Sequence, residues 1–168
     1  MSASANPKIG LRPFLPQDAA VLAAIFRASV EELTEDDYSP AQQEAWASLA
    51  EDEQDFGDKL GKNLTLIATF DGSPMGFASL ENNTVVDMLY VHPAAARMGV
   101  ATTLCDALEK LAAARGATEL TTDASDTARE FFARRGFVAH QRNTVTVGDE
   151  WLGNTTMKKA LAANGAAS

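Results

Sequence analysis

The chain has 168 residues, of which 46% are hydrophobic and 22% charged, and its formal net charge is −9. This length and composition favour one globular domain, expected to span residues 1–168 with a core at about 9–160 and loose ends. The negative charge argues against nucleic acid as a partner, because such binding relies on basic surface. No apolar run approaches the ~18 residues of a membrane span, and no apolar signal segment follows Met1, so a cytoplasmic protein is expected.

The first part of the chain predicts one strand and up to three helices. Residues 9–14 are expected to form a short strand, and a helix opens at 16–18. The segment 39–42, Ser-Pro-Ala-Gln, is a capping box with proline at the first helical position, which predicts the start of a second helix. A short third helix is expected around 56–60, ending at Gly61.

The second part of the chain predicts strands that pair through turns and strands that alternate with helices. Strands are expected over 64–70, 75–81, 84–91, 119–123, 137–147 and 151–158, and helices over 99–115 and 125–135. Parallel pairing is expected where strands and helices alternate, with antiparallel pairing before and after. The expected fold is therefore α/β, with a central mixed sheet of about seven strands and helices on both faces.

One segment, Val86 to Ala101, combines a strand, a turn bounded by Pro93, and a glycine at the start of a helix. The first N–H groups of a helix have no partner within it, and the helix dipole adds partial positive charge there. Gly99 has no Cβ, so phosphate oxygens can approach the backbone. The segment therefore predicts a pyrophosphate site, with an ordinary strand-to-helix loop as the alternative. The sequence contains neither G-x-x-x-x-G-K-[S/T] nor G-x-G-x-x-G.

Two motifs resemble those of the GNAT superfamily of N-acetyltransferases. The first is Leu89-x-Val91-x-Pro93, followed by Gly99-x-Ala101 at the start of a helix. The second places Ser125, Ala128, Phe131, Phe132, Gly136 and Phe137 along a helix and the strand after it. The expected order of elements agrees as well. The resemblance implies a GNAT-like fold and an acyltransferase that uses acetyl-CoA.

The resemblance also implies how acetyl-CoA would be held as a co-substrate. Backbone groups of 89–91 would pair with the pantetheine arm like an added strand. The amides of 97–101 would hold the pyrophosphate, and residues 125 and 131–132 would line the thiol end. The binding residues implied in this way are Leu89, Tyr90, Val91, Arg97, Met98, Gly99, Val100, Ala101, Thr102, Ser125, Phe131 and Phe132.

The sequence departs from the family pattern at two positions. Similar proteins usually carry Gln or Arg where this chain has Ala96, so Arg97 could supply the charge instead, or it could simply face solvent. They often carry tyrosine where Phe132 stands, as the acid that protonates the leaving thiolate. That role is then absent or is supplied by another group.

Acetyl transfer to an amine needs a group that takes the amine proton and donors that polarise the thioester carbonyl. Asp87, in the fourth strand, is the first candidate base, and Asp123, at the end of the fifth, is the second. Tyr38 and Tyr90 are candidates to donate or relay protons. The alternative for Asp87 is a carboxylate paired structurally within the sheet. For Asp123 it is a helix cap before Ser125, and for Tyr90 a packed aromatic side chain.

The histidines and the cysteine are weaker candidates for a catalytic or metal-binding role. His92 and His140 are the only histidines, and their spacing indicates no metal site, so no metal is expected. His92 is a lesser candidate base, and its loop position favours a side chain that points to solvent. Cys105, the only cysteine, lies in an apolar helix and is expected to be a packed thiol rather than a nucleophile.

Two acidic clusters lie where the family selects its acceptor. They consist of Glu31, Glu32, Glu35, Asp36 and Asp37, and of Glu51, Asp52, Glu53 and Asp55. Carboxylates there would concentrate a cationic amine, whereas a solvated surface is the alternative.

The sequence thus predicts an enzyme that transfers acetyl from acetyl-CoA to a primary amine of a small molecule or peptide, by direct attack in a ternary complex. Nucleic acid and membrane are not expected as partners, and a homodimer is left open. One alternative is a regulatory module that binds acyl-CoA but is catalytically quiet. This alternative stays open because Phe132 stands where the family often has a catalytic tyrosine. A second is an α/β interaction domain without a ligand.

Overall fold

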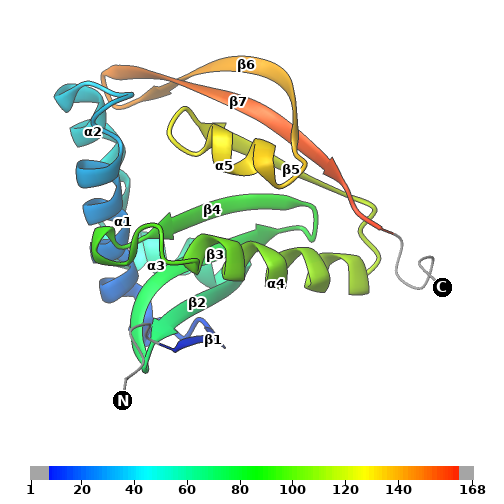
Figure 1. Cartoon of the computed structure of the whole chain (residues 1–168). Helices are drawn as coiled ribbons and strands as arrows, with labels where there is room; N and C mark the ends of the chain where they lie inside the picture. Colours follow the sequence, from blue (N-terminus) through cyan, green and yellow to red (C-terminus); the bar gives the residue numbers. More distant parts are fainter. Residues whose placement is uncertain (1–7, 163–168) are drawn as a thin grey trace.

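The computed structural model describes residues 8–162, and these build one mixed sheet with helices around it (Figure 1). The strands are β1 (Ile9–Pro13), β2 (Leu64–Phe70), β3 (Ser73–Glu81), β4 (Val85–Val91), β5 (Glu119–Ser125), β6 (Val138–Val147) and β7 (Glu150–Ala160). The helices are α1 (Ala19–Leu33), α2 (Pro40–Ala47), α3 (Glu53–Lys62), α4 (Val100–Ala114) and α5 (Arg129–Arg134), with short 3₁₀ turns at Pro16–Asp18, Ser48–Ala50 and Pro93–Ala95.

The sheet has seven strands in the order β1-β2-β3-β4-β5-β7-β6. Strands β1 to β4 form an antiparallel meander, and β5, β7 and β6 form a second antiparallel group. The two groups are joined by the parallel pair β4–β5. The predicted mixed sheet is confirmed, with parallel pairing where strand and helix alternate.

Helices cover both faces of the sheet, as expected. Helices α1 and α3 pack on one face, where the buried residues include Leu22, Phe26, Val30, Phe56, Leu60, Ile67 and Phe77. Helix α4 packs on the other face, where the buried residues include Leu80, Val86, Leu104, Leu108, Leu120 and Met157. Figure 1 shows α4 lying across β2 to β4, with α5 beside it against β5. The core therefore has two halves, one on each face.

A β-bulge interrupts β4 next to its junction with β5. Ser79 of β3 pairs with Met88 and Leu80 pairs with Val86, so Asp87 between them has no partner on β3. Bulges bend a strand and re-aim a side chain, and they are frequent beside active sites. This bulge lies next to the last β4–β5 pair, which is Val86 with Thr122.

The capping box predicted at the start of the second helix, α2, is confirmed. Ser39 Oγ accepts from the backbone N–H of Gln42, and the Gln42 side chain accepts from the backbone N–H of Ser39. The helix predicted over 125–135 is shorter than expected, because β5 continues to Ser125 and α5 begins only at Arg129. The third helix also runs past Gly61, since helix α3 ends at Lys62.

Three further expectations concern the cysteine thiol, membrane-spanning helices and the ends of the chain. Burial raises the pKa of Cys105 to about 12, so this thiol stays protonated and packed. Within residues 8–162, no helix is long and apolar enough to cross a membrane. The expected loose ends lie almost entirely outside the described residues.

Candidate active site

The site is created where β4 and β5 separate. The two strands pair only through Val85–Thr121 and Val86–Thr122, and the Thr122 hydroxyl donates to the Val86 carbonyl at 2.9 Å. Beyond this point lie two cavities of about 210 and 600 Å³. Both cavities are lined by Trp46, Leu89, Tyr90, Ser125 and Ala128. Because they share these walls, the two cavities adjoin at the gap between β4 and β5, and the two together are called the passage.

The larger cavity ends at the start of α4. Gly99 is the N-cap with φ 88°, and Arg97 has φ 63°, so the loop turns twice through the left-handed region. The first intrahelical bond is from the Thr103 N–H to the Gly99 carbonyl at 3.0 Å. No residue within 8–162 offers a backbone acceptor to the N–H groups of 97–102. These free donors and the helix dipole fit an anion, as expected for the pyrophosphate.

The expected binding residues fall mostly on the walls of this passage. The larger cavity is lined by Leu89, Tyr90, Val91, Arg97, Gly99, Val100, Ala101, Thr102, Ser125 and Phe131. Phe132 lies on the smaller cavity and is 3% exposed. Met98 is 40% exposed and lines neither cavity.

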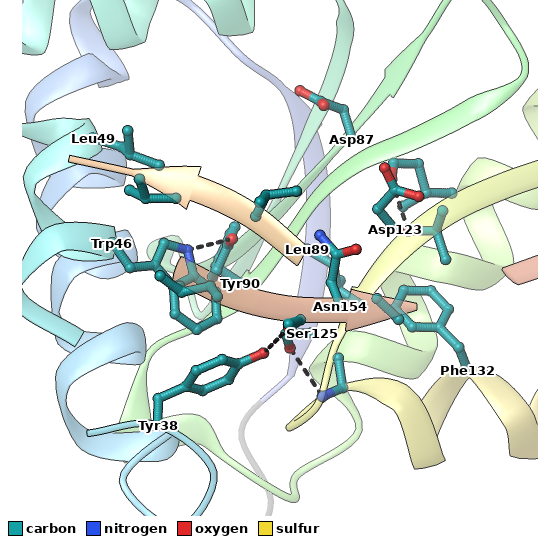
Figure 2. Close-up of a pocket in the computed structure, with 18 residues that line it drawn as sticks. Tyr38, Trp46, Leu49, Asp87, Leu89, Tyr90, Asp123, Ser125, Phe132 and Asn154 are labelled. Atoms are coloured by element: carbon teal, nitrogen blue, oxygen red, sulfur yellow. Dashed lines mark hydrogen bonds between the residues drawn. The ribbon is translucent and has the colours of Figure 1, made fainter. Parts of the chain in front are cut away.

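The smaller cavity brings together carboxylates and apolar side chains from distant parts of the chain (Figure 2). Its polar side chains include Asp87, Asp123 and Asn154, and its apolar wall includes Trp46, Leu49, Phe132, Val145, Val147 and Leu152. In Figure 2 the Asn154 side chain projects from β7 into the space between Tyr90 and Phe132. Asn154 is a site residue that the sequence analysis did not single out.

Asp87 stands at the bulge of β4. Its Oδ2 lies 3.6 Å from Lys59 Nζ of α3, and this buried oxygen has no hydrogen-bond partner within residues 8–162. The Lys59 side chain is 56% exposed and the Asp87 side chain 22%. A partly solvated ion pair of this kind contributes little to stability.

Asp123 is held differently. Its Oδ1 accepts a hydrogen bond of 2.6 Å from the hydroxyl of Thr156, which lies opposite it on β7. The alternative of a helix cap does not apply, because β5 continues past Asp123 and pairs with β7 as far as Ser125. Thr156 in turn accepts from Asn143 on β6. The sequence alone could not find these partners, since their pairing depends on strand register.

The two candidate tyrosines differ in what their hydroxyl groups contact. The Tyr38 hydroxyl donates to the Gly153 carbonyl at 2.6 Å and accepts from the Asp126 N–H at 2.9 Å. The Tyr90 hydroxyl accepts from Trp46 Nε1 at 3.3 Å, and no acceptor for its proton lies within residues 8–162. Burial raises the pKa of Tyr38 and raises that of Tyr90 to about 12. Both phenols are therefore protonated at neutral pH.

Ser125 and His92 both hold turns of the backbone. Ser125 Oγ accepts from the Ala128 N–H at 3.1 Å, between β5 and α5. His92 Nδ1 accepts from the Ala94 N–H at 3.0 Å, so its side chain turns back on its own loop rather than simply out to solvent. Over residues 8–162, no group of three or more His, Cys, Asp and Glu side chains is placed to hold a metal ion.

None of the nine residues of the two acidic clusters lines either cavity. Asp52 instead caps α3 by accepting from the Asp55 N–H, and Asp37 accepts from the Thr127 hydroxyl at 2.8 Å. The carboxylates that do line the passage are those of Asp87 and Asp123.

Comparison with known proteins agrees with this architecture. Residues 34–161 match the model of the acetyltransferase (GNAT) domain. The chain is 37% identical to the uncharacterized N-acetyltransferase YafP of Escherichia coli K12, over 89% of this chain and 95% of that protein.

Solved structures show the same fold. The crystal structure of a GCN5-related N-acetyltransferase from Rhodopseudomonas palustris is 61% identical with a TM-score of 0.90, covering 96% of this chain and 99% of that one. PaiA N-acetyltransferase from Thermoplasma acidophilum, solved with coenzyme A, shares the fold at 20% identity, with a TM-score of 0.75 and coverage of 91% and 99%. The domain match, the sequence identity and the shared fold together establish that this chain belongs to the GNAT family of acetyltransferases.

Proposed function

We propose that this protein transfers the acetyl group of acetyl-CoA to a primary amine of a small molecule or peptide, by direct attack while both substrates are bound. The observation that carries this proposal is the passage at the gap between β4 and β5, with free backbone donors at one end and carboxylates at the other. Two substrates that enter from opposite ends would meet at the shared walls beside Leu89 and Tyr90. Holding them together supplies much of the rate gain.

In this proposal acetyl-CoA occupies the larger cavity. The N–H groups of 97–101 bind its pyrophosphate, and Arg97, which lines the same cavity, adds positive charge. The backbone of β4 from Leu89 to Val91 pairs with the pantetheine arm. The PaiA structure, which shares the fold, was solved in complex with coenzyme A, which supports coenzyme A as a ligand of this fold. The thioester then reaches the gap near Ser125 and Phe132.

The acceptor amine occupies the smaller cavity. A carboxylate, Asp87 in the first place, takes a proton from the ammonium or from the attacking nitrogen. The nitrogen bonds to the thioester carbon, and backbone N–H groups stabilise the oxyanion that forms. The carbon–sulfur bond then breaks and the thiolate takes a proton. Tyr90 is our choice for that donor, because its proton has no acceptor within residues 8–162.

The test is amine-dependent release of free CoA over a panel of small primary amines and short peptides. Asp87→Asn is expected to lower kcat by about 10²- to 10⁴-fold, because general-base catalysis typically contributes that much. Asp149→Asn, in the exposed turn between β6 and β7, is the matched control and should keep the parent rate.

Three outcomes would change the proposal. Full activity of Asp87→Asn together with a slow Asp123→Asn would move the base to Asp123. Rates that depend on a covalent acetyl-enzyme would exclude direct attack. Tight acetyl-CoA binding without turnover of any amine would favour the catalytically quiet module.

A further inference from the structure

A chain of side-chain hydrogen bonds crosses three neighbouring strands on the wall of the smaller cavity. Asp123 of β5 pairs with Thr156 of β7, and Asn154 of β7 pairs with Asn143 of β6. Asn143 Nδ2 donates to Asn154 Oδ1 at 2.9 Å and to Thr156 Oγ1 at 2.8 Å. Thr156 Oγ1 donates to Asp123 Oδ1 at 2.6 Å.

The Asp123 carboxylate fixes the direction of every bond in this chain. An ionised carboxylate only accepts, so the Thr156 hydroxyl must use its one proton on Asp123. Thr156 can then only accept from Asn143, which must turn its NH₂ group toward it. The Asn143 oxygen faces the other way and accepts from Gln141 Nε2 at 3.1 Å. Asn143 therefore has no freedom to flip.

The orientation of Asn154 follows from that of Asn143. Because Asn143 presents an NH₂ group, Asn154 must present its oxygen to it. The Asn154 NH₂ group then remains, with no acceptor within residues 8–162, and Asn154 lies on the cavity wall (Figure 2). The smaller cavity is thus lined by a pre-oriented amide donor and by two carboxylates, those of Asp87 and Asp123.

We propose that Asn154 selects acceptors that carry an uncharged oxygen, as an ether, hydroxyl or carbonyl, a few bonds from the amine, and that Asn143 is the residue that positions it. This inference rests on the proposed function. The carboxylates of Asp87 and Asp123 attract the ammonium group and would repel an acceptor carboxylate. A neutral oxygen therefore suits the Asn154 donor.

The experiment compares 2-methoxyethylamine with butylamine, which differ by one oxygen in place of a methylene. The measured quantity is the ratio of their kcat/KM values, because the difference in amine basicity then cancels between variants. Asn154→Leu, close to isosteric, is expected to lower this ratio by about three- to tenfold, the usual effect of one neutral hydrogen bond. Thr144→Ala, on β6 one residue away and exposed, should leave the ratio unchanged.

Two variants at Asn143 test its positioning role. Asn143→Ala frees the Asn154 amide to rotate, so the ratio should fall part of the way. Asn143→Asp introduces an acceptor that draws the Asn154 NH₂ group away from the cavity, so the ratio should fall below that of Asn143→Ala. A purely structural role would lower both kcat/KM values together and leave their ratio alone. Circular dichroism melts check that each variant folds.

The Kd values of the two amines are also measured with CoA bound. Their ratio gives the same comparison without depending on turnover. An unchanged ratio in Asn154→Leu, with both amines acetylated, would overturn the inference and leave the proposed function standing. The parent protein could bind 2-methoxyethylamine in preference to butylamine, lose that preference in Asn154→Leu, and acetylate neither amine. That outcome would support the inference and contradict the proposed function.

Discussion

Tyr38 and Tyr90 both border the smaller cavity, but their hydroxyl groups differ in hydrogen bonding. The proton of Tyr38 is used in the bond to the Gly153 carbonyl, and its oxygen accepts from Asp126. The oxygen of Tyr90 accepts from Trp46, its proton has no acceptor within residues 8–162, and Tyr90 lines the smaller cavity. A phenol with a raised pKa is a weak acid in the ground state, yet a thiolate formed beside it can take its proton. This contrast is why we propose Tyr90 as the donor.

The first prediction concerns this donor and Phe132. Tyr90→Phe is expected to lower kcat by at least about tenfold, while acetyl-CoA binding stays close to the parent, because one catalytic proton donor is lost. Phe132→Tyr alone should change kcat modestly, since the parent already has a donor. In the double variant, the hydroxyl at 132 should restore part of the loss. Rapid-mixing kinetics of CoA release would measure each rate.

The control for this prediction is Tyr38→Phe, which removes a hydroxyl that joins the loop after α1 to β7 and to the loop after β5. It is expected to lower stability by about 1–3 kcal/mol, because the Asp126 N–H and the Gly153 carbonyl lose their partner. An unchanged kcat in Tyr90→Phe would instead mean that solvent protonates the thiolate.

At the scale of elements, the N-terminus of α4 is held tightly against the sheet. A Cβ at Gly76 of β3 would lie 2.8 Å from Val100 Cγ1 and 3.0 Å from the Tyr90 carbonyl. The missing side chain at Gly76 allows this approach, which brings the first turn of α4 against β3. This packing places the loop that carries Arg97 and Gly99 on the wall of the larger cavity.

The second prediction tests that arrangement. Gly99→Glu is expected to weaken acetyl-CoA binding by roughly 10- to 100-fold in calorimetry, because it adds a negative charge and displaces hydrogen bonds to a charged group. Gly116→Glu is the matched control, since Gly116 has φ 95° against 88° for Gly99 and open space around each Cβ position.

Both glycine variants should lose comparable stability, about 1–2 kcal/mol, from a non-glycine residue in the left-handed region. Gly116 follows the other end of α4 and lines neither cavity of the passage. Equal loss of acetyl-CoA affinity in both variants would show that backbone strain, and not the pyrophosphate site, is responsible.

At the scale of the whole molecule, charge is distributed unevenly with respect to the site. The net charge of −9 and the two acidic clusters surround the chain with negative potential, while the carboxylates on the cavity walls are those of Asp87 and Asp123. We propose on this basis that the acceptor is a cation. Long-range attraction would then raise its local concentration, and contact with the two aspartates would select its ammonium group.

The third prediction is the salt dependence of the acceptor KM. Between about 0.01 and 0.1 M salt, the screening length falls from roughly 30 to 10 Å, so the KM of a cationic amine should rise roughly two- to fivefold. As a control, 2,2,2-trifluoroethylamine, which is uncharged at neutral pH, should show a flat KM. The same salt dependence of KM for both amines would mean that the acidic clusters are an ordinary solvated surface with no role in attracting the acceptor.

Local sequence patterns were enough to predict the features that depend on neighbouring residues. The capping box at Ser39, the glycine at the start of α4 and the strand that precedes it are local patterns, because turn and cap chemistry act over a few residues. The order of strands and helices then restricted the topology to a mixed sheet. The helix expected from Ser125 was too long, because pairing with β7 extends β5 through that residue.

The assembly of the site, in contrast, depends on contacts between distant parts of the chain. The Tyr38 hydroxyl meets a carbonyl 115 residues away, and Asp123 meets a hydroxyl 33 residues away. Such contacts depend on the register between β5, β7 and β6, and a shift of one residue would turn every side chain to the other face. The opening between β4 and β5 likewise depends on how two strands from different parts of the chain diverge after Val86 and Thr122. No periodicity within either strand encodes that divergence, so the cavity and its orienting asparagines emerge only when the sheet is complete.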